Sequence, residues 1–233
     1  MILAGAFTNG MAIIVGGLLG LIFTFIPAPI KDSIMKIQAL IILTLGIQMV
    51  VQADDIIITL LSLIVGVVIG EVIRLEEMLN RFGHWMEIKL GDKHAGNLSQ
   101  GFVSGTLVFI VGAMAIVGGL DAGLRGSNEV LITKSIMDFF IAIVMTTTYG
   151  LGVIISGVPT FFYESGIILS AQQIAKFIPD FILDQMIQQV TSTGGVILLA
   201  IALNMLNITK MRVGNMIPAI FTAMLMVYLV NIF

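Results

Sequence analysis

Two carboxylates are the first residues in this chain that could do chemistry, because both fall within largely apolar stretches. Glu164 lies in the segment 161–166, of sequence FFYESG, and Asp138 follows Lys134 by four residues. A charged side chain at the centre of a bilayer costs at least about 2.5–3.5 kcal/mol, so its presence needs a reason. A functional explanation for Glu164 is that it acts as a proton relay or a cation ligand. The alternative is that Glu164 lies in a loop or near the membrane surface, where its charge costs little. For Asp138 the reason is a role as ligand, or else an ion pair with Lys134 at helical spacing.

Neutral polar side chains form a second group of possible ligands. Amide side chains in a helix bundle often bridge helices, and such hydrogen bonds contribute about 0.6 kcal/mol each on average. Their oxygen atoms are also suitable ligands for Na⁺ or for a polar solute. Five residues of this kind lie in or beside apolar stretches: Asn9, Gln48, Asn204, Asn207 and Asn215.

A hydroxyl- and glycine-rich segment at 191–195, of sequence TSTGG, is the third possible site. We expect it to open a helix over 193–207. The free N–H groups of a helix N-terminus attract anions, and Thr193, Gly194 and Gly195 would then bind a ligand. The alternative is an ordinary N-cap, in which a hydroxyl satisfies one of those N–H groups.

The composition places these residues in a membrane protein. The 233 residues are 58% apolar and 11% charged, with a mean hydropathy of +1.09, whereas soluble domains carry about 25% charge. Continuous apolar runs favour helices over a barrel, since each backbone amide in lipid needs a partner within its own segment. The net charge of −3 gives no indication of a nucleic-acid partner, and the absence of cysteine excludes disulfides and thiolate chemistry.

The apolar runs predict an all-α, polytopic membrane helix bundle that forms one domain over 1–233. Each span needs roughly 20 helical residues. We expect seven or eight crossings, depending on whether the more polar segment 158–178 crosses the bilayer. The predicted ranges are 2–26, 34–52, 55–73, 101–120, 135–156, 158–178, 193–207 and 216–233.

The polar segment 74–98 is expected to leave the bilayer. Over 74–90, apolar residues recur on one helical face and charged residues lie opposite. This pattern predicts a helix at the membrane interface with Trp85 at headgroup level. The alternative is that this helix docks a protein partner. The segment 176–190 carries a similar amphipathic pattern, so we expect a second interfacial helix there.

An internal repeat gives the clearest indication of architecture. The sequence IVGGL at 14–18 recurs at 116–120, and SIM at 33–35 recurs at 135–137, both with an offset of 102 residues. Three crossings per copy would invert the second copy relative to the first. Many transporters use this arrangement to alternate access to a midplane site. The two predicted copies and the extra helices cover about 1–98, 101–190 and 191–233.

The distribution of basic residues predicts the orientation. With eight crossings, the odd-numbered connections hold eight Lys or Arg residues and the even-numbered ones hold three. Basic loops favour the cytoplasmic side, so both termini are expected outside. With seven crossings the C-terminus would move inside. Because no Lys or Arg precedes Lys31, we expect the first helix to be retained rather than cleaved as a signal peptide.

Several enzyme classes find no support in the sequence. The chain has no GxSxG, HExxH or P-loop motif. His84 and His94 lie in the polar segment, where solvated side chains are expected. We therefore predict neither an enzyme nor a cofactor requirement, and the sequence leaves the question of a metal open.

Several short motifs resemble those of a known family. They are Asn9-Gly10, the pair Gly16-Gly17, GGLD at 118–121, TGG at 193–195 and VGNMIPA at 213–219. Together they are similar to the bacterial YqgA/YdfK-like inner-membrane proteins, a family classed as a domain of unknown function, over essentially the whole chain. The resemblance implies a bacterial plasma membrane. It brings no established substrate and no functional residues.

These observations predict a secondary transporter or ion pathway for a small solute, assembled as a homodimer in the lipid bilayer. The polar residues Asn9, Gln48, Glu164 and Asn204 would converge with 193–195 near the midplane. The alternative is a membrane scaffold or regulatory subunit that transports nothing and docks a partner through 74–98.

Overall fold

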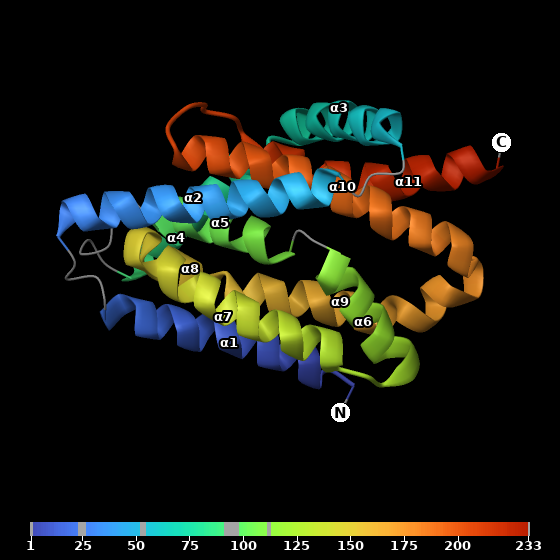
Figure 1. Cartoon of the computed structure of the whole chain (residues 1–233), viewed down its shortest axis with the longest axis horizontal. Coiled ribbons are helices and arrows are strands. Elements are labelled where there is room, and N and C mark those ends of the chain that lie inside the picture. Colours follow the sequence, from blue (N-terminus) through green and yellow to red (C-terminus); the bar gives the residue numbers. More distant parts are fainter. Residues whose placement is uncertain (1, 23–26, 52–54, 91–97, 111–112, 233) are drawn as a thin grey trace. The chain divides into compact units, whose positions relative to one another are not determined.

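Helices form the elements of the structure, a computed structural model in which residues 2–22, 27–51, 55–90, 98–110 and 113–232 are described (Figure 1). In chain order these elements are α1 (Ala4–Ile22), α2 (Ala28–Val50), α3 (Ile56–Ile73), α4 (Leu75–Leu90), α5 (Leu98–Ile110), α6 (Ala113–Arg125), α7 (Glu129–Tyr149), α8 (Leu151–Ile155), α9 (Gly157–Phe177), α10 (Asp180–Met205), the 3₁₀ helix η3 (Val213–Met216) and α11 (Pro218–Ile232). The prediction of an all-α membrane bundle is confirmed.

The chain divides into two compact units. The first unit is built from Met1–Gln38, Glu77–Ile110 and Met114–Ala171. The second unit is built from Ala39–Glu76, Val111–Ala113 and Gln172–Phe233. The helices α2, α4 and α9 each contribute residues to both units.

In the first unit, α1 packs along α7 and α8, and α5 packs against the same two helices (Figure 1). Glycines let the helices approach closely. A Cβ atom on Gly17 of α1 would lie 2.5 Å from the side chain of Ile154, and one on Gly119 of α6 would lie 2.6 Å from that of Ile167 in α9. Close helix approach through small residues is a common way of packing membrane helices.

In the second unit, α3, α10 and α11 pack against one another, and η3 lies against α3. The buried face of α3 consists of small residues at helical spacing, namely Thr59, Ser62, Gly66 and Gly70. A Cβ atom on Gly66 would overlap the backbone of Ala219 in α11. The remaining surface of α3 is rich in exposed Ile, Leu and Val side chains, which suits a helix with one face toward protein and the others toward lipid.

Six helices are long and apolar enough to cross a membrane, judged by length and composition over the described residues. They are Ala4–Ile22, Ile56–Ile73, Glu129–Tyr149, Leu151–Gln173, Phe181–Met205 and Val213–Asn231. A seventh span results if α5 and α6 form one broken span, and α2 contributes the shorter apolar stretch Ala39–Val50. The count agrees roughly with the predicted seven or eight, and most of the doubtful segment 158–178 lies in one of the six.

Local sequence explains several helix ends. The Asp55 side chain accepts a hydrogen bond from the N–H of Ile57 at 2.7 Å and so caps α3, where its negative charge also suits the helix dipole. Arg74 ends α3 in the left-handed conformation, with φ of 56°. Gly150, with φ of 63°, separates α7 from α8. Pro218 lies in the first turn of α11, where its missing N–H costs little.

The prediction of one continuous helix over 101–120 is wrong. The helix α5 ends at Ile110, and its axis is bent by 58° relative to that of α6. The carbonyl oxygen of Phe109, in the last turn of α5, accepts a hydrogen bond from the ammonium group of Lys134. A helix end away from water needs such a partner, because its last carbonyls have none within the helix.

Other predicted boundaries also differ from the structure. The helix expected over 135–156 begins earlier, at Glu129, and is interrupted at Gly150. The helix expected over 34–52 begins earlier as well, at Ala28. The expected end of the first helix falls on residues 23–26, which lie outside the described residues.

The segment 191–195 lies in the interior of α10, which runs unbroken from Asp180 to Met205. The prediction that this segment opens a helix is therefore wrong. The prediction of a separate interfacial helix over 176–190 is also wrong, because residues 180–190 belong to α10 and residues 176–177 belong to α9. Hydroxyl side chains need not end a helix when they bond back to its own carbonyls, and Thr191 Oγ1 donates to the carbonyl of Ile187 at 2.7 Å.

Replacing Gly70 by alanine should destabilise the second unit, because the added Cβ would overlap the carbonyl oxygen of Asn215. We expect a cost of about 1–3 kcal/mol, which is typical of overpacking. The matched control is Gly166→Ala in α9, where a Cβ atom meets nothing within 4 Å and alanine is the better helix former by up to about 1 kcal/mol. Thermal unfolding midpoints in detergent check both variants, and equal midpoints would contradict the packing assignment.

Candidate functional site

Four polar side chains come together within the first unit, and all of them are buried. Asn9 comes from α1, Lys134 and Asp138 come from α7, and Glu164 comes from α9. None of the four is more than 6% exposed. We call these four residues, with the carbonyl group of Phe109 from α5, the Lys134 cluster.

The ammonium group of Lys134 is the centre of this cluster. Its Nζ atom donates to the carbonyl oxygen of Phe109 at 2.8 Å and to Oδ2 of Asp138. It also lies 3.4 Å from Oε1 of Glu164. The predicted pairing of Lys134 with Asp138 is confirmed, and the structure adds Glu164 as a second carboxylate beside the same ammonium group.

Asn9 connects α1 to Glu164. Its Nδ2 atom donates to Oε1 of Glu164 at 2.7 Å, in a fully buried hydrogen bond between residues 155 positions apart. The remaining side-chain oxygen of each residue makes no such contact. Within the described part of the chain, neither Oε2 of Glu164 nor Oδ1 of Asn9 has a hydrogen-bond partner.

The charges of the Lys134 cluster do not balance when all three ionisable groups are charged. One ammonium group then faces two carboxylates, Asp138 and Glu164, which leaves one excess negative charge. Burying a charge without compensation is costly, and an unpaired buried oxygen adds to that cost. The arrangement can therefore take up one positive charge, as a proton or as a small cation.

Glycines explain why α1 and α9 approach closely enough for this contact. Gly10 follows Asn9 in the chain, and a Cβ atom on Gly10 would lie 3.1 Å from the carbonyl oxygen of Gly157. A Cβ atom on Gly157 would in turn lie 2.8 Å from the carbonyl oxygen of Gly10. Two facing glycines thus permit a backbone separation that places Asn9 within hydrogen-bonding distance of Glu164.

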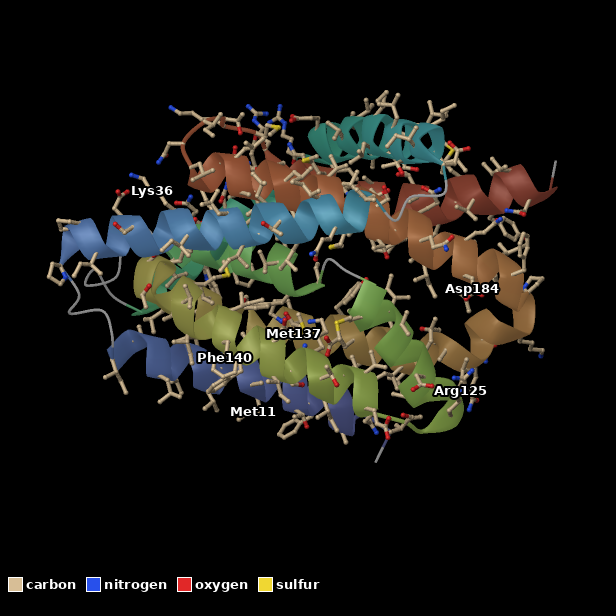
Figure 2. All side chains as sticks on the ribbon, viewed as in Figure 1. Met11, Lys36, Arg125, Met137, Phe140 and Asp184 are labelled. Carbon is tan, nitrogen blue, oxygen red and sulfur yellow. The ribbon has the colours of Figure 1, made fainter. Side chains whose placement is uncertain are left out.

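Beyond its first turn, the helix α7 has its charged residues on the buried face and large apolar residues on the exposed face. Lys134 and Asp138 lie four residues apart on the buried face. Met137 and Phe140 of the same helix are exposed (Figure 2). This inverted distribution is expected for a helix whose outer face meets lipid and whose inner face meets polar groups.

Thr193, Gly194 and Gly195 are also buried, but they belong to the second unit. A Cβ atom on Gly195 would lie 2.7 Å from the carbonyl oxygen of Gly46 in α2, so this glycine permits close packing. The Oγ1 atom of Thr193 has no hydrogen-bond partner among the described residues. Because all three residues lie within α10, the predicted ligand binding by free N–H groups of a helix N-terminus does not apply to them.

A neutral hydrogen-bonded group surrounds this part of α10. Thr59 Oγ1 lies 2.9 Å from Oε1 of Gln189 and 3.1 Å from Oγ of Ser192. Nearby in the same unit, Thr222 Oγ1 donates to the carbonyl oxygen of Ser62 at 2.7 Å. These contacts tie α3 to α10 and to α11 without any charged group.

The predicted amide ligands of the second unit do not come together at one site. Gln48 is exposed on α2. Asn204 holds the loop that follows α10, since its Oδ1 accepts from the N–H of Met211 at 2.9 Å and its Nδ2 donates to the carbonyl of Met211 at 2.7 Å. Asn207 lies beyond the end of α10 in the left-handed conformation, with φ of 57°, so its predicted position within a helix is wrong.

Asn215 holds the start of α4 against η3. Its Oδ1 atom accepts from the N–H of Glu76 at 2.7 Å, and a carboxylate oxygen of Glu76 accepts from the N–H of Gly214 at 3.1 Å. Burial raises the pKa of Glu76 above its ordinary value, while the hydrogen bond from Gly214 acts in the opposite direction. These reciprocal bonds give Asn215 a structural role at the end of α3.

Two parts of the Lys134 cluster were not among the predicted ligands. Lys134 was expected only as the partner of Asp138, and the Phe109 carbonyl carries no signal in the sequence because any residue supplies one. In the described part of the chain, no group of three or more His, Asp or Glu side chains could hold a metal ion. His94 lies outside the described residues.

Comparison with known proteins agrees with the resemblance noted in the sequence. Residues 4–228 match the family described as protein of unknown function (DUF554). The chain belongs to this family.

Two relatives of this DUF554 chain cover nearly its whole length. It is 27% identical to the uncharacterized membrane protein YdfK of Bacillus subtilis (strain 168), over 98% of this chain and 97% of that protein. It is 28% identical to the uncharacterized protein YqgA of Escherichia coli (strain K12), over 94% of each chain. No solved structure matches.

Replacing Asn9 by alanine should destabilise the protein by about 1–3 kcal/mol, because it removes a buried hydrogen bond to the Glu164 carboxyl group and leaves Oε1 of that group without this donor. Gln48→Ala is the matched control, since this amide is exposed on α2 and its loss should change stability by no more than about 0.5 kcal/mol. Thermal unfolding in detergent measures both. A loss of stability in Gln48→Ala as large as that in Asn9→Ala would contradict the assigned role of Asn9.

Proposed function

We propose that this DUF554 protein is a secondary transporter or ion pathway for a small solute, and that the Lys134 cluster is its ion-binding site. The observation that carries the proposal is the buried excess of one carboxylate, together with the two unpaired oxygens of Asn9 and Glu164. Ionisable groups inside membrane helices are rare, and they commonly mark ion or substrate pathways.

The angle between α5 and α6 gives further support. In transporters, discontinuous helices often supply backbone carbonyls that coordinate cations within the bilayer. Here the axes of α5 and α6 differ by 58°, and the carbonyl of Phe109, in the last described turn of α5, binds an ammonium group. The cluster therefore combines side-chain carboxylates with a main-chain carbonyl at a helix end.

A purely structural ion pair accounts for less of the geometry. The pair Lys134–Asp138 alone would be neutral and would need no further carboxylate. Glu164 adds a second negative charge, and its Oε2 atom is left unpaired within the described residues. A structural site would be expected to satisfy its buried polar atoms fully.

The surroundings of this site remain predictions from the sequence. We expect the protein to lie in a bacterial plasma membrane as a homodimer, with the N-terminus outside and with two inverted three-helix copies. We expect no enzymatic activity and no cofactor.

Flux in proteoliposomes tests the proposal. Vesicles that contain the purified protein are incubated with the small-molecule fraction of a bacterial extract, and solute entry is measured by mass spectrometry. We expect Glu164→Gln to lower entry by about tenfold or more, because an ion-binding carboxylate is replaced by a neutral amide of the same shape. The control is Glu129→Gln, since Glu129 is exposed at the start of α7 and its loss should leave entry unchanged.

Two results would overturn the proposal. Undiminished entry in Glu164→Gln would remove Glu164 from the mechanism. An absence of entry and of ion currents with the wild-type protein would contradict transport and favour the scaffold alternative. In that case a stoichiometric partner should copurify with the protein and be lost when residues 75–90 are deleted.

A further inference from the structure

We infer that the positive charge taken up by the Lys134 cluster is a proton on Oε2 of Glu164, and that the Lys134 ammonium group is a resident cation that keeps alkali cations out. The part of this inference that concerns transport rests on the proposed function. The protonation of Glu164 and the exclusion of alkali cations rest on the geometry of the site, and both can be measured without a flux experiment.

The two unpaired oxygens belong to the same pair of groups. Asn9 Nδ2 already donates to Oε1 of Glu164 at 2.7 Å, while Oδ1 of Asn9 and Oε2 of Glu164 lack partners within the described residues. A carboxylic acid hydroxyl donates, and an amide oxygen accepts. In the protonated pair that we infer, Oε2 donates to Oδ1 of Asn9, so that one proton gives both oxygens a partner in a cyclic acid–amide pair. The same proton removes the excess negative charge of the cluster.

The Lys134 ammonium group already occupies the position that an alkali cation would take. Its Nζ atom is held by the Phe109 carbonyl, by the Asp138 carboxylate and by nearby Oε1 of Glu164. Three oxygens match the three N–H donors of an ammonium group. Carbonyl and carboxylate oxygens are also the usual ligands of hard cations. The site is thus built for a cation and is filled by one that is tethered to the chain.

A second cation beside Lys134 would meet both repulsion and a shortage of ligands. Two unit charges about 4 Å apart, at an effective dielectric constant of about 20, repel strongly enough to weaken binding about a thousandfold. Among the fully buried side-chain atoms that the structure describes in the Lys134 cluster, only Oε2 of Glu164 and Oδ1 of Asn9 are unpaired. Two oxygens fall short of the six or more that hard cations usually take from protein and water, whereas a proton needs one donor bond and one acceptor.

The groups that face the proton can be named for each packed helix. They are Asn9 on α1, Lys134 and Asp138 on α7, and the Phe109 carbonyl on α5. Tyr163 precedes Glu164 on α9 and interacts electrostatically with it. In the step itself, an O–H bond forms at Oε2 when a proton arrives from water on one side of the membrane. The same bond breaks when the proton returns to water on the other side, and the carboxylate that remains is held by Lys134 and Asn9.

Infrared spectroscopy of the purified protein tests the protonated pair. We expect wild-type protein at neutral pH to carry the C=O stretching band of a buried carboxylic acid. The band should be lost in Glu164→Gln and retained in Glu129→Gln, whose carboxylate is exposed. A spectrum with no such band, or a band unchanged in Glu164→Gln, would overturn the inference.

Sodium-dependent stability tests the resident cation. Unfolding midpoints are compared in NaCl and in choline chloride at equal ionic strength. We expect no difference for wild type. For Lys134→Ala we expect saturating Na⁺ to raise the midpoint by about 5 °C, because the vacated position can then bind Na⁺ in the folded state alone. Lys36→Ala is the matched control, since Lys36 also pairs with an aspartate at four-residue spacing, Asp32, but on an exposed surface (Figure 2).

Besides the expected result, the sodium experiment has three possible outcomes, and two of them contradict part of the inference. A Na⁺-dependent midpoint in wild type would show an alkali site beside Lys134 and overturn the inference. A folded Lys134→Ala variant whose unfolding midpoint is the same in NaCl and in choline chloride would contradict the inference that Lys134 occupies a cation site. If Lys134→Ala yields no folded protein, the double variant Lys134→Ala with Asp138→Asn keeps the cluster at one excess negative charge and is measured in the same way. If the double variant also yields no folded protein, the infrared measurement alone tests the inference, through the carboxylic acid band of Glu164.

The two proposals fail separately. A protein that carries the Glu164 band and follows the sodium pattern, but moves no solute or ion, contradicts the proposed function and leaves the protonated pair intact. A protein that transports a solute but binds Na⁺ in its wild-type form contradicts the proton assignment alone.

Discussion

The cost of burying charge is the constraint on which the first unit depends. Lys134, Asp138 and Glu164 lie within helices, where neighbouring protein groups must take the place of water. The Lys134 ammonium group meets this requirement through oxygens from α5, α7 and α9, and Asn9 adds α1 through its hydrogen bond to Glu164. Loss of one member leaves charge unpaired on the others, so four helices depend on a single electrostatic arrangement.

Backbone packing makes that arrangement possible. The facing pair Gly10 and Gly157 lets α1 and α9 approach more closely than any side chain would permit. The Phe109 carbonyl lies in the last described turn of α5, where it accepts a hydrogen bond from Lys134. Glycines cost stability in a soluble helix, but here they let α1 and α9 approach closely enough for Asn9 to reach Glu164.

In the second unit, buried contacts between helices are made by neutral polar groups. Hydroxyl and amide side chains join α3 to α10 through Thr59, Gln189 and Ser192, and the helices pack through small residues. Charged contacts appear at the end of α3, where a carboxylate oxygen of Glu71 lies 2.9 Å from the guanidinium group of Arg212 and both side chains are exposed to solvent or lipid. The buried ionisable side chains of the Lys134 cluster belong to the first unit, so the proposed ion binding is a property of that unit.

Composition and helical spacing by themselves determined that this is a helical membrane protein, that Lys134 can reach Asp138, and that Glu164 needs a reason to be buried. These properties depend on local sequence, because lipid forces each segment to satisfy its own backbone and residues four apart share a helix face. The tertiary structure decided that Glu164 meets Lys134 and Asn9, that Phe109 supplies an oxygen, and that 191–195 continues a helix. These contacts depend on which helix faces meet, and they join residues as many as 155 positions apart in the sequence. The periodicity of a helix shows which of its faces is buried, but it does not show which other helix packs against that face.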